Sequence, residues 1–288
     1  MPPPFPAEQS SLSPSSHIAR MIESGEAHSV PAADGTPILW RRFGSGTPVV
    51  LLHGGHGDWM HWFRNVAALS AYREVWIPDM PNFGDSGDLP VSSFAHLCDA
   101  TLSSLDTLLG AGTAIDLVGF SFGGMVAAAI ATKRPVTRLI LVGSGGHRSV
   151  GRDHPALLNW HKTDDAEARI TMLNANVRTF MFHDASAVSP LIESIYARQC
   201  LRTRFRSRGS WGGATLQDFL QTAKVKTLLL WGDQDVTLAS PTDYSAKLRE
   251  AHIRHELVLV PGAGHWLQCE AAEAANTAFI AFLQNAKD

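Results

Sequence analysis

Short apolar runs alternate along the chain with longer segments in which apolar residues recur at helical spacing. Short runs bounded by turn residues are typical of buried strands, and longer segments with a period of about 3.6 indicate helices. The predicted strands are 26–30, 37–43, 48–52, 74–78, 115–119, 138–143, 226–231 and 256–260. The predicted helices between them are 59–70, 92–109, 122–133, 240–251 and 271–284. This alternation predicts an α/β fold with a mostly parallel eight-stranded sheet and helices on both faces.

The regular alternation is interrupted in three places. The first two strands are expected to form an antiparallel hairpin through Asp34-Gly35. Residues 1–16 are rich in Pro and Ser and are predicted to be disordered, before a short helix at 17–23. No buried strand is evident from 148 to 223, where 164–178, 189–198 and 214–223 look helical. The chain is therefore divided into a core of residues 17–147 and 224–288 and a helical insertion of residues 148–223.

A candidate nucleophile lies between a predicted strand and a predicted helix, in Gly119-Phe120-Ser121-Phe122-Gly123. This G-x-S-x-G pattern in this context is the signature of a nucleophile elbow. The tight turn strains the backbone at Ser121, and the flanking glycines let strand and helix approach closely. An ordinary Gly-rich turn is the alternative for such a short pattern.

The residues that a serine nucleophile needs follow later in the chain. A serine hydroxyl requires a base, and the base requires a third group that fixes its tautomer. His265 follows the strand 256–260, while Asp233 and Asp235 both follow the strand 226–231. Asp235 is preferred because it lies further beyond its strand, where a loop can carry the carboxylate to the imidazole. The order Ser121, Asp235, His265 differs from the orders of chymotrypsin and subtilisin.

The loop His53-Gly54-Gly55-His56-Gly57 follows the apolar strand 48–52. Acyl transfer builds an oxyanion, which backbone N–H donors of such a loop and of the residue after the nucleophile can stabilise. Gly55 and Phe122 are therefore the predicted donors.

From about residue 48 to its end, the chain resembles an α/β-hydrolase of the large cap-bearing group. Within that group it is similar to the serine-dependent C–C bond hydrolases of aromatic meta-cleavage pathways. The similarity lies in His53-Gly54-Gly55, in Phe63-Arg64-Asn65-Val66 and in Gly264-His265-Trp266-Leu267-Gln268. The resemblance implies that residues 148–223 form a cap above Ser121. The loop departs from the Gly-Gly-Gly-Pro-Gly form common in those enzymes, which leaves the substrate open.

Three further residues are candidates for substrate binding: Trp266 beside the base, His56 at the mouth of the cleft, and Arg198 in the cap. A guanidinium can bind a substrate carboxylate in a bidentate manner. The alternative for Arg198 and for the other cap arginines, at 202, 204, 206 and 208, is a solvated helix surface. The expected substrate is a small aromatic or acyl compound, with or without a carboxylate.

The composition limits the expected classes of partner and the expected location of the protein. A net charge of −3, from 24 basic and 27 acidic residues, predicts no binding to nucleic acid or anionic membranes. Cys98, Cys200 and Cys269 are few and far apart, which indicates a reducing, cytoplasmic location without a disulfide framework. The N-terminal residues lack the pattern of a signal peptide, and no apolar run has the length of a membrane span. Self-association is left open.

The 13 histidines raise the question of a metal site, above all at His53, His56 and His61. We expect neither metal nor cofactor, because the Gly-rich loop has another use for its backbone and lacks the usual zinc-ligand spacing. Asp79 and Asp85 are expected to cap turns rather than to take part in catalysis.

The predicted function is a cofactor-independent serine hydrolase that acts on an ester or on a C–C bond beside a ketone. Two alternatives stay open at this point. One is a non-catalytic ligand receptor on the same fold, and the other is a cofactor-free peroxidase or lyase that uses the same triad.

Overall fold

The computed structural model describes residues 12–207 and 210–284. Most of the tail predicted to be disordered lies outside these residues. The prediction is wrong for residues 14–16, because helix α1 spans Pro14–Ser24. Pro14 stands in the first turn, and the Ser13 side chain accepts a hydrogen bond from the Ser16 amide. Both features favour a helix start at this point.

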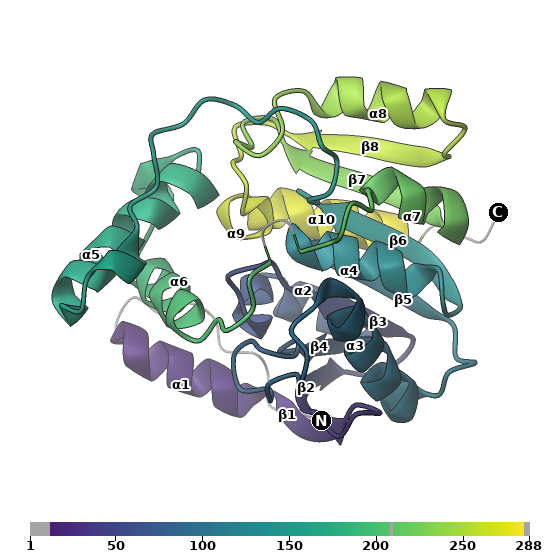
Figure 1. Ribbon diagram of the computed structural model, residues 1–288, viewed down its shortest axis with the longest axis horizontal. Coiled ribbons are helices and arrows are strands. Elements are labelled where there is room, and N and C mark those ends of the chain that lie inside the picture. Colours follow the sequence, from purple (N-terminus) through teal and green to yellow (C-terminus); the bar gives the residue numbers. More distant parts are fainter. Residues whose placement is uncertain (1–11, 208–209, 285–288) are drawn as a thin grey trace.

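The central sheet has eight strands in the order β1-β2-β4-β3-β5-β6-β7-β8 (Figure 1). Its strands are β1 (Glu26–Pro31), β2 (Pro37–Gly44), β3 (Pro48–Leu52), β4 (Glu74–Pro78), β5 (Ile115–Phe120), β6 (Val136–Val142), β7 (Lys226–Gly232) and β8 (His255–Val260). The hairpin β1–β2 and the pair β2–β4 are antiparallel, and the remaining pairs are parallel. The fold class, the hairpin and the eight predicted strands are confirmed.

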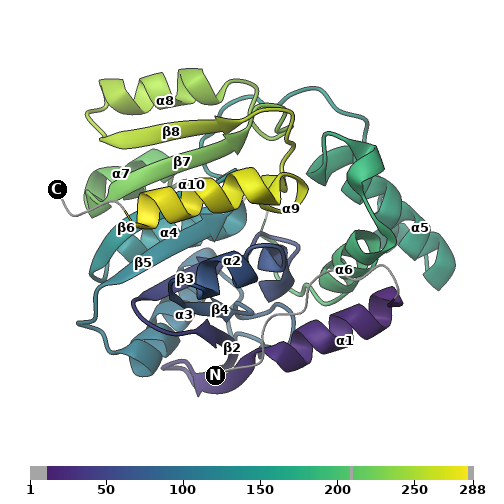
Figure 2. The same ribbon diagram turned by 180° about the vertical axis from the view of Figure 1, so that it is seen from behind.

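Successive strand residues point to opposite faces of the sheet, and each face carries its own hydrophobic core. In β3, Val49 and Leu51 belong to one core, and Val50 and Leu52 to the other. Helices α2 (Val66–Ser70) and α10 (Ala272–Gln284) cover the first face (Figure 2). Helices α3 (Phe94–Leu109), α4 (Phe122–Ala131) and α8 (Pro241–Glu250) cover the second (Figure 1). A 3₁₀ turn, Trp59–Trp62, replaces the first part of the helix predicted at 59–70.

The predicted insertion contains α5 (Ala166–Asn176), the π-helical turn η3 (Val177–Met181), α6 (Pro190–Leu201) and α7 (Leu216–Ala223), with short 3₁₀ turns at Trp160–Lys162 and Ala185–Ala187. Helices α5 and α6 stand beside the sheet, with α1 along α6 (Figure 1). Helix α7, by contrast, packs on α4. Leu216 and Leu220, one helical turn apart, join the core of that sheet face. Helix α7 therefore packs with the core, although the predicted insertion extends to residue 223.

None of the described helices is long and apolar enough to cross a membrane.

Candidate active site

Ser121 occupies a sharp turn between β5 and α4. Its backbone adopts φ 51° and ψ −114°, a conformation that costs a non-glycine residue energy and persists only where the surroundings enforce it. The Ser121 amide donates to the Val142 carbonyl at 2.9 Å. A Cβ atom at Gly119 would collide with the Gly123 carbonyl, and one at Gly123 with the His53 carbonyl. Glycine at both positions is thus required for the strand and helix to approach as they do.

The structure brings Ser121, His265 and Asp235 into one hydrogen-bonded chain. Ser121 Oγ lies 3.0 Å from His265 Nε2, and His265 Nδ1 lies 2.9 Å from Asp235 Oδ2. With Asp235 as acceptor, Nδ1 carries the imidazole proton, which leaves Nε2 to accept the serine proton. The Asp235 and His265 side chains are buried, whereas Ser121 is partly exposed.

Thr237 supports the acid and was not predicted from the sequence. Its amide and its hydroxyl donate to Asp235 Oδ1 at 2.8 and 2.7 Å. Burial alone would raise the pKa of Asp235, but the neighbouring His265 and the Thr237 donors bring this pKa below its ordinary value. A threonine two residues after an aspartate is the signal that could have indicated this turn.

Asp233, the competing candidate, faces elsewhere. Its Oδ1 accepts the Gly262 amide at 2.8 Å and so closes the turn after β8. Of the two carboxylates, only that of Asp235 lies within hydrogen-bonding distance of the His265 imidazole.

The predicted oxyanion donors lie side by side. A Cβ atom built on Gly55 would lie 3.4 Å from the Phe122 Cβ, and it would collide with Ser207 Oγ. In the described part of the chain, neither the Gly55 amide nor the Phe122 amide donates to a protein acceptor. Both are therefore available to a ligand beside Ser121.

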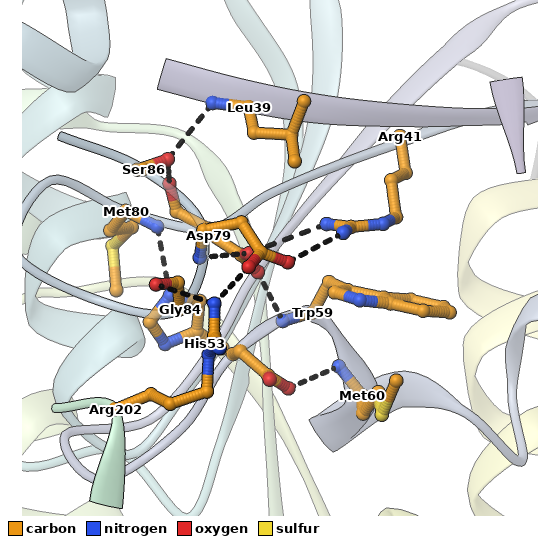
Figure 3. A network of polar contacts seen from close by, with 12 residues as sticks. Leu39, Arg41, His53, Trp59, Met60, Asp79, Met80, Gly84, Ser86 and Arg202 are labelled. Atoms are coloured by element: carbon orange, nitrogen blue, oxygen red, sulfur yellow. Dashed lines mark hydrogen bonds and ion pairs between the residues drawn. The ribbon is translucent and has the colours of Figure 1, made fainter. Parts of the chain in front are cut away.

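Two neutral histidines hold the loop that carries Gly55. Met80 N donates to His53 Nε2 at 2.9 Å (Figure 3), and His53 Nδ1 donates to the Gly54 carbonyl at 2.9 Å. The Gly54 amide donates to His61 Nδ1 at 3.0 Å. Burial lowers the pKa of His53 and holds that of His61 well below its ordinary value. No three His, Cys, Asp or Glu residues gather as a metal site among the residues described.

Aromatic rings surround the triad. The rings of Phe120 and of the cap residue Phe180 lie 5.0 and 5.4 Å from that of His265, measured between centroids. The Phe122 ring is buried and lies 5.6 Å from Phe205, which follows α6. Phe180 is only partly buried, so its ring offers surface beside the base.

Arg198 does not present a free guanidinium to the site. Its Nη1 pairs with Asp58, which is fully buried, and its Nη2 lies 3.5 Å from Asp85. This placement favours a structural role for Arg198 over the predicted binding of a substrate carboxylate, because core carboxylates already occupy its donors. Its sequence position on α6 could not reveal them, since they follow β3 and β4.

The Arg198 pairs belong to a larger cluster that joins cap and core. Asp79 accepts from Arg41 at 3.3 Å and from the Trp59 amide at 3.0 Å (Figure 3). The cluster contains three core carboxylates, one core guanidinium and two cap guanidiniums. The members are Asp58, Asp79, Asp85 and Arg41 of the core, and Arg198 and Arg202 of the cap. The turn-capping role predicted for Asp79 and Asp85 therefore omitted these ion pairs.

The other predicted substrate-binding residues lie in different environments. Trp266 is fully buried, and its Nε1 donates to the His61 carbonyl at 2.9 Å, which contradicts the prediction that it contacts substrate. His56 has an exposed side chain. Arg204 pairs with Asp88 at 2.5 Å, and Arg208 lies outside the described residues.

Comparison with known proteins decides the family. Residues 49–276 match the model of the alpha/beta hydrolase family. The chain belongs to this family. It is 29% identical over 263 residues to a 2-hydroxy-6-oxo-6-phenylhexa-2,4-dienoate hydrolase of Burkholderia cepacia, covering 84% of this chain and 89% of the relative.

Comparison with solved structures agrees with this family assignment. A meta-cleavage product hydrolase of Pseudomonas fluorescens IP01 superimposes with a TM-score of 0.72 at 25% identity, covering 89% of this chain and 97% of the other. An esterase of Rhodococcus sp. ECU1013 has a TM-score of 0.74 at 19% identity, with 90% and 98% covered, and shows the shared fold alone. The resemblance to C–C bond hydrolases is confirmed.

Proposed function

We propose that this hydrolase uses Ser121 as the nucleophile on a carbonyl substrate, with His265 as general base and acid and Asp235 as the residue that orients His265. The observation that carries the proposal is the hydrogen-bonded chain from Ser121 Oγ to Asp235, set on a strained turn. A serine held at that turn keeps its hydroxyl at the tip, within hydrogen-bonding distance of His265.

The proposed reaction has two steps, acylation of Ser121 and hydrolysis of the acyl group, and both use the same residues. Ser121 Oγ attacks the carbonyl carbon while its proton passes to His265 Nε2, and the amides of Gly55 and Phe122 bind the oxyanion. Collapse of this intermediate breaks the bond to the leaving group, which takes the proton from His265. Water, deprotonated by His265, then releases the acyl group from Ser121.

Ester hydrolysis of a neutral, aromatic or apolar substrate is the activity that the surroundings of the triad favour. The rings of Phe120 and Phe180 flank the base. Three cap guanidiniums, those of Arg198, Arg202 and Arg204, are each paired with a core carboxylate, so they offer little to an anionic substrate.

C–C bond hydrolysis is the second candidate, and the names of the relatives favour it. There the leaving group is a carbon, so the dienol part of the bound substrate must first tautomerise to its keto form. Ser121 then attacks the ketone already present, and the departing carbon leaves as a stabilised enolate when the C–C bond breaks. The ester reaction needs the same residues without that step.

A panel assay separates these functions. The purified protein is incubated with neutral aryl esters, lactones and carboxylated vinylogous diketones, with Ser121→Ala as the control. We expect turnover of aryl esters, stoichiometric labelling of Ser121 by a fluorophosphonate, and a loss of several powers of ten in Ser121→Ala. Turnover of the diketones alone would favour the C–C reaction. A protein that binds these compounds without turnover or labelling would be a receptor instead.

Four further expectations about this hydrolase stay predictions. They are a small-molecule substrate, no nucleic-acid partner, no cofactor and a cytoplasmic location.

A further inference from the structure

Glu270 links the base of the cap to the loop that carries His265. It ends the short helix α9 (Leu267–Glu270), which lies on the side of the core facing the cap helices (Figure 2). Its carboxylate accepts the Gly264 amide at 2.7 Å, the Asp184 amide at 2.8 Å and the His183 amide at 3.0 Å. Two of these donors belong to the cap, and the third directly precedes His265.

The two segments that Glu270 joins also touch each other. The Trp266 amide donates to the Met181 carbonyl at 2.7 Å, on the far side of His265 from Gly264. A Cβ atom at Gly264 would lie 2.5 Å from the His183 amide nitrogen, which a real side chain could not tolerate. The residues on both sides of His265 are therefore fixed against the cap segment 181–184.

The same cap segment continues from the π-helical turn that presents Phe180 to the His265 ring. A shift of residues 181–184 would thus move both a wall of the site and the loop that bears the base. Hydrogen bonds to an ionised carboxylate are shorter and stronger than bonds between neutral groups, so one side chain can hold three amides in place.

We propose that Glu270 is a positioning residue, which sets the alignment of His265 with Ser121 by tying the His265 loop to the base of the cap. This inference rests on the proposed function of His265 as the base. It concerns a residue that does not itself touch the reacting atoms.

The test compares Glu270→Gln with Glu273→Gln, a matched change at an exposed glutamate three residues further along. Glutamine keeps the length of the side chain, but it removes the charge and turns an NH₂ group toward an amide donor. We expect kcat for aryl esters to fall by roughly 10- to 100-fold in Glu270→Gln, the scale of a small misalignment of a catalytic group. We expect KM to change little, and Ser121 labelling by a small fluorophosphonate to slow in parallel. Glu273→Gln should match the parent protein.

Two results would overturn the positioning role of Glu270. A purely structural role would lower the melting temperature of Glu270→Gln and leave its kcat at 25 °C unchanged. A rise in KM at constant kcat would also overturn the proposal, because the cap alone would then be affected.

Amide hydrogen exchange at Gly264, His183 and Asp184 needs no turnover. Faster exchange in Glu270→Gln than in Glu273→Gln supports the link even if the parent protein fails to label at Ser121, in which case the proposed function fails separately. Unchanged exchange at all three amides would show that Glu270 does not hold these segments, and the proposal would fall.

Discussion

Replacing Arg198 by alanine tests whether this arginine serves the fold or the substrate. Asp58 has 0% of its surface exposed, and its carboxylate pairs with Arg198 on one oxygen. On the other oxygen it accepts the Met60 amide and Gln199 Nε2, both at 2.9 Å. Arg198→Ala would leave a buried carboxylate with neutral donors only.

The environment of Asp58 sets the expected loss in the free energy of unfolding. Removing one partner of a buried ion pair typically costs about 3–5 kcal/mol of stability. The Arg198 side chain is 19% exposed and Asp58 keeps two neutral donors, so the loss should lie at or just below the low end of this range. We expect a loss of about 2–3 kcal/mol in the free energy of unfolding. With about 2–4 °C per kcal/mol for a large domain, the melting temperature should drop by about 4–12 °C.

The assay combines thermal unfolding with steady-state kinetics on a neutral aryl ester and on an ester that carries a carboxylate. Arg206→Ala is the control, because Arg206 is exposed in the same part of the cap. Arg198→Ala should lower the melting temperature and affect both esters alike. An unchanged melting temperature, with a KM that rises only for the carboxylated ester, would refute the structural role and restore Arg198 as a substrate-binding residue.

Three further predictions follow from the site. Asp235→Asn should reduce kcat by several powers of ten while Asp233→Asn retains most activity, and the reverse result in ester kinetics would reassign the acid. Gly55→Ala should lower kcat by roughly 10- to 100-fold because its methyl group collides with Ser207, and Ser207→Gly in the same chain should recover part of the rate; equal kcat values would remove Gly55 from the oxyanion site. The pKa of buried His61 lies well below that of the unfolded chain, so the unfolded state takes up the proton first as pH falls. Stability should therefore decrease below about pH 6.5 by up to roughly 1.4 kcal/mol per pH unit for this group, and urea unfolding of His61→Gln should show a shallower dependence; identical slopes would contradict a neutral buried imidazole.

The sequence determined the local structure of this chain. Strands such as Pro48–Leu52 are short apolar runs, and Ser121 stands between glycines at the junction of a strand and a helix. Such features depend on neighbouring residues in the chain, because side-chain periodicity and turn chemistry act over a few positions. For that reason, the sequence was sufficient to predict the fold class, the strand positions and the candidates Ser121, Asp235 and His265.

Only the tertiary structure decided which polar groups pair with one another. Arg198 and Trp266 were assigned to the substrate from their positions in the chain, yet Asp58 and His61, both more than a hundred residues away, occupy their polar groups. Glu270 gained its proposed positioning role in the same way, through the amides of the cap. A buried polar group must find a partner wherever the folded chain supplies one. That partner is fixed by the packing of distant segments, so no local pattern in the sequence could identify it.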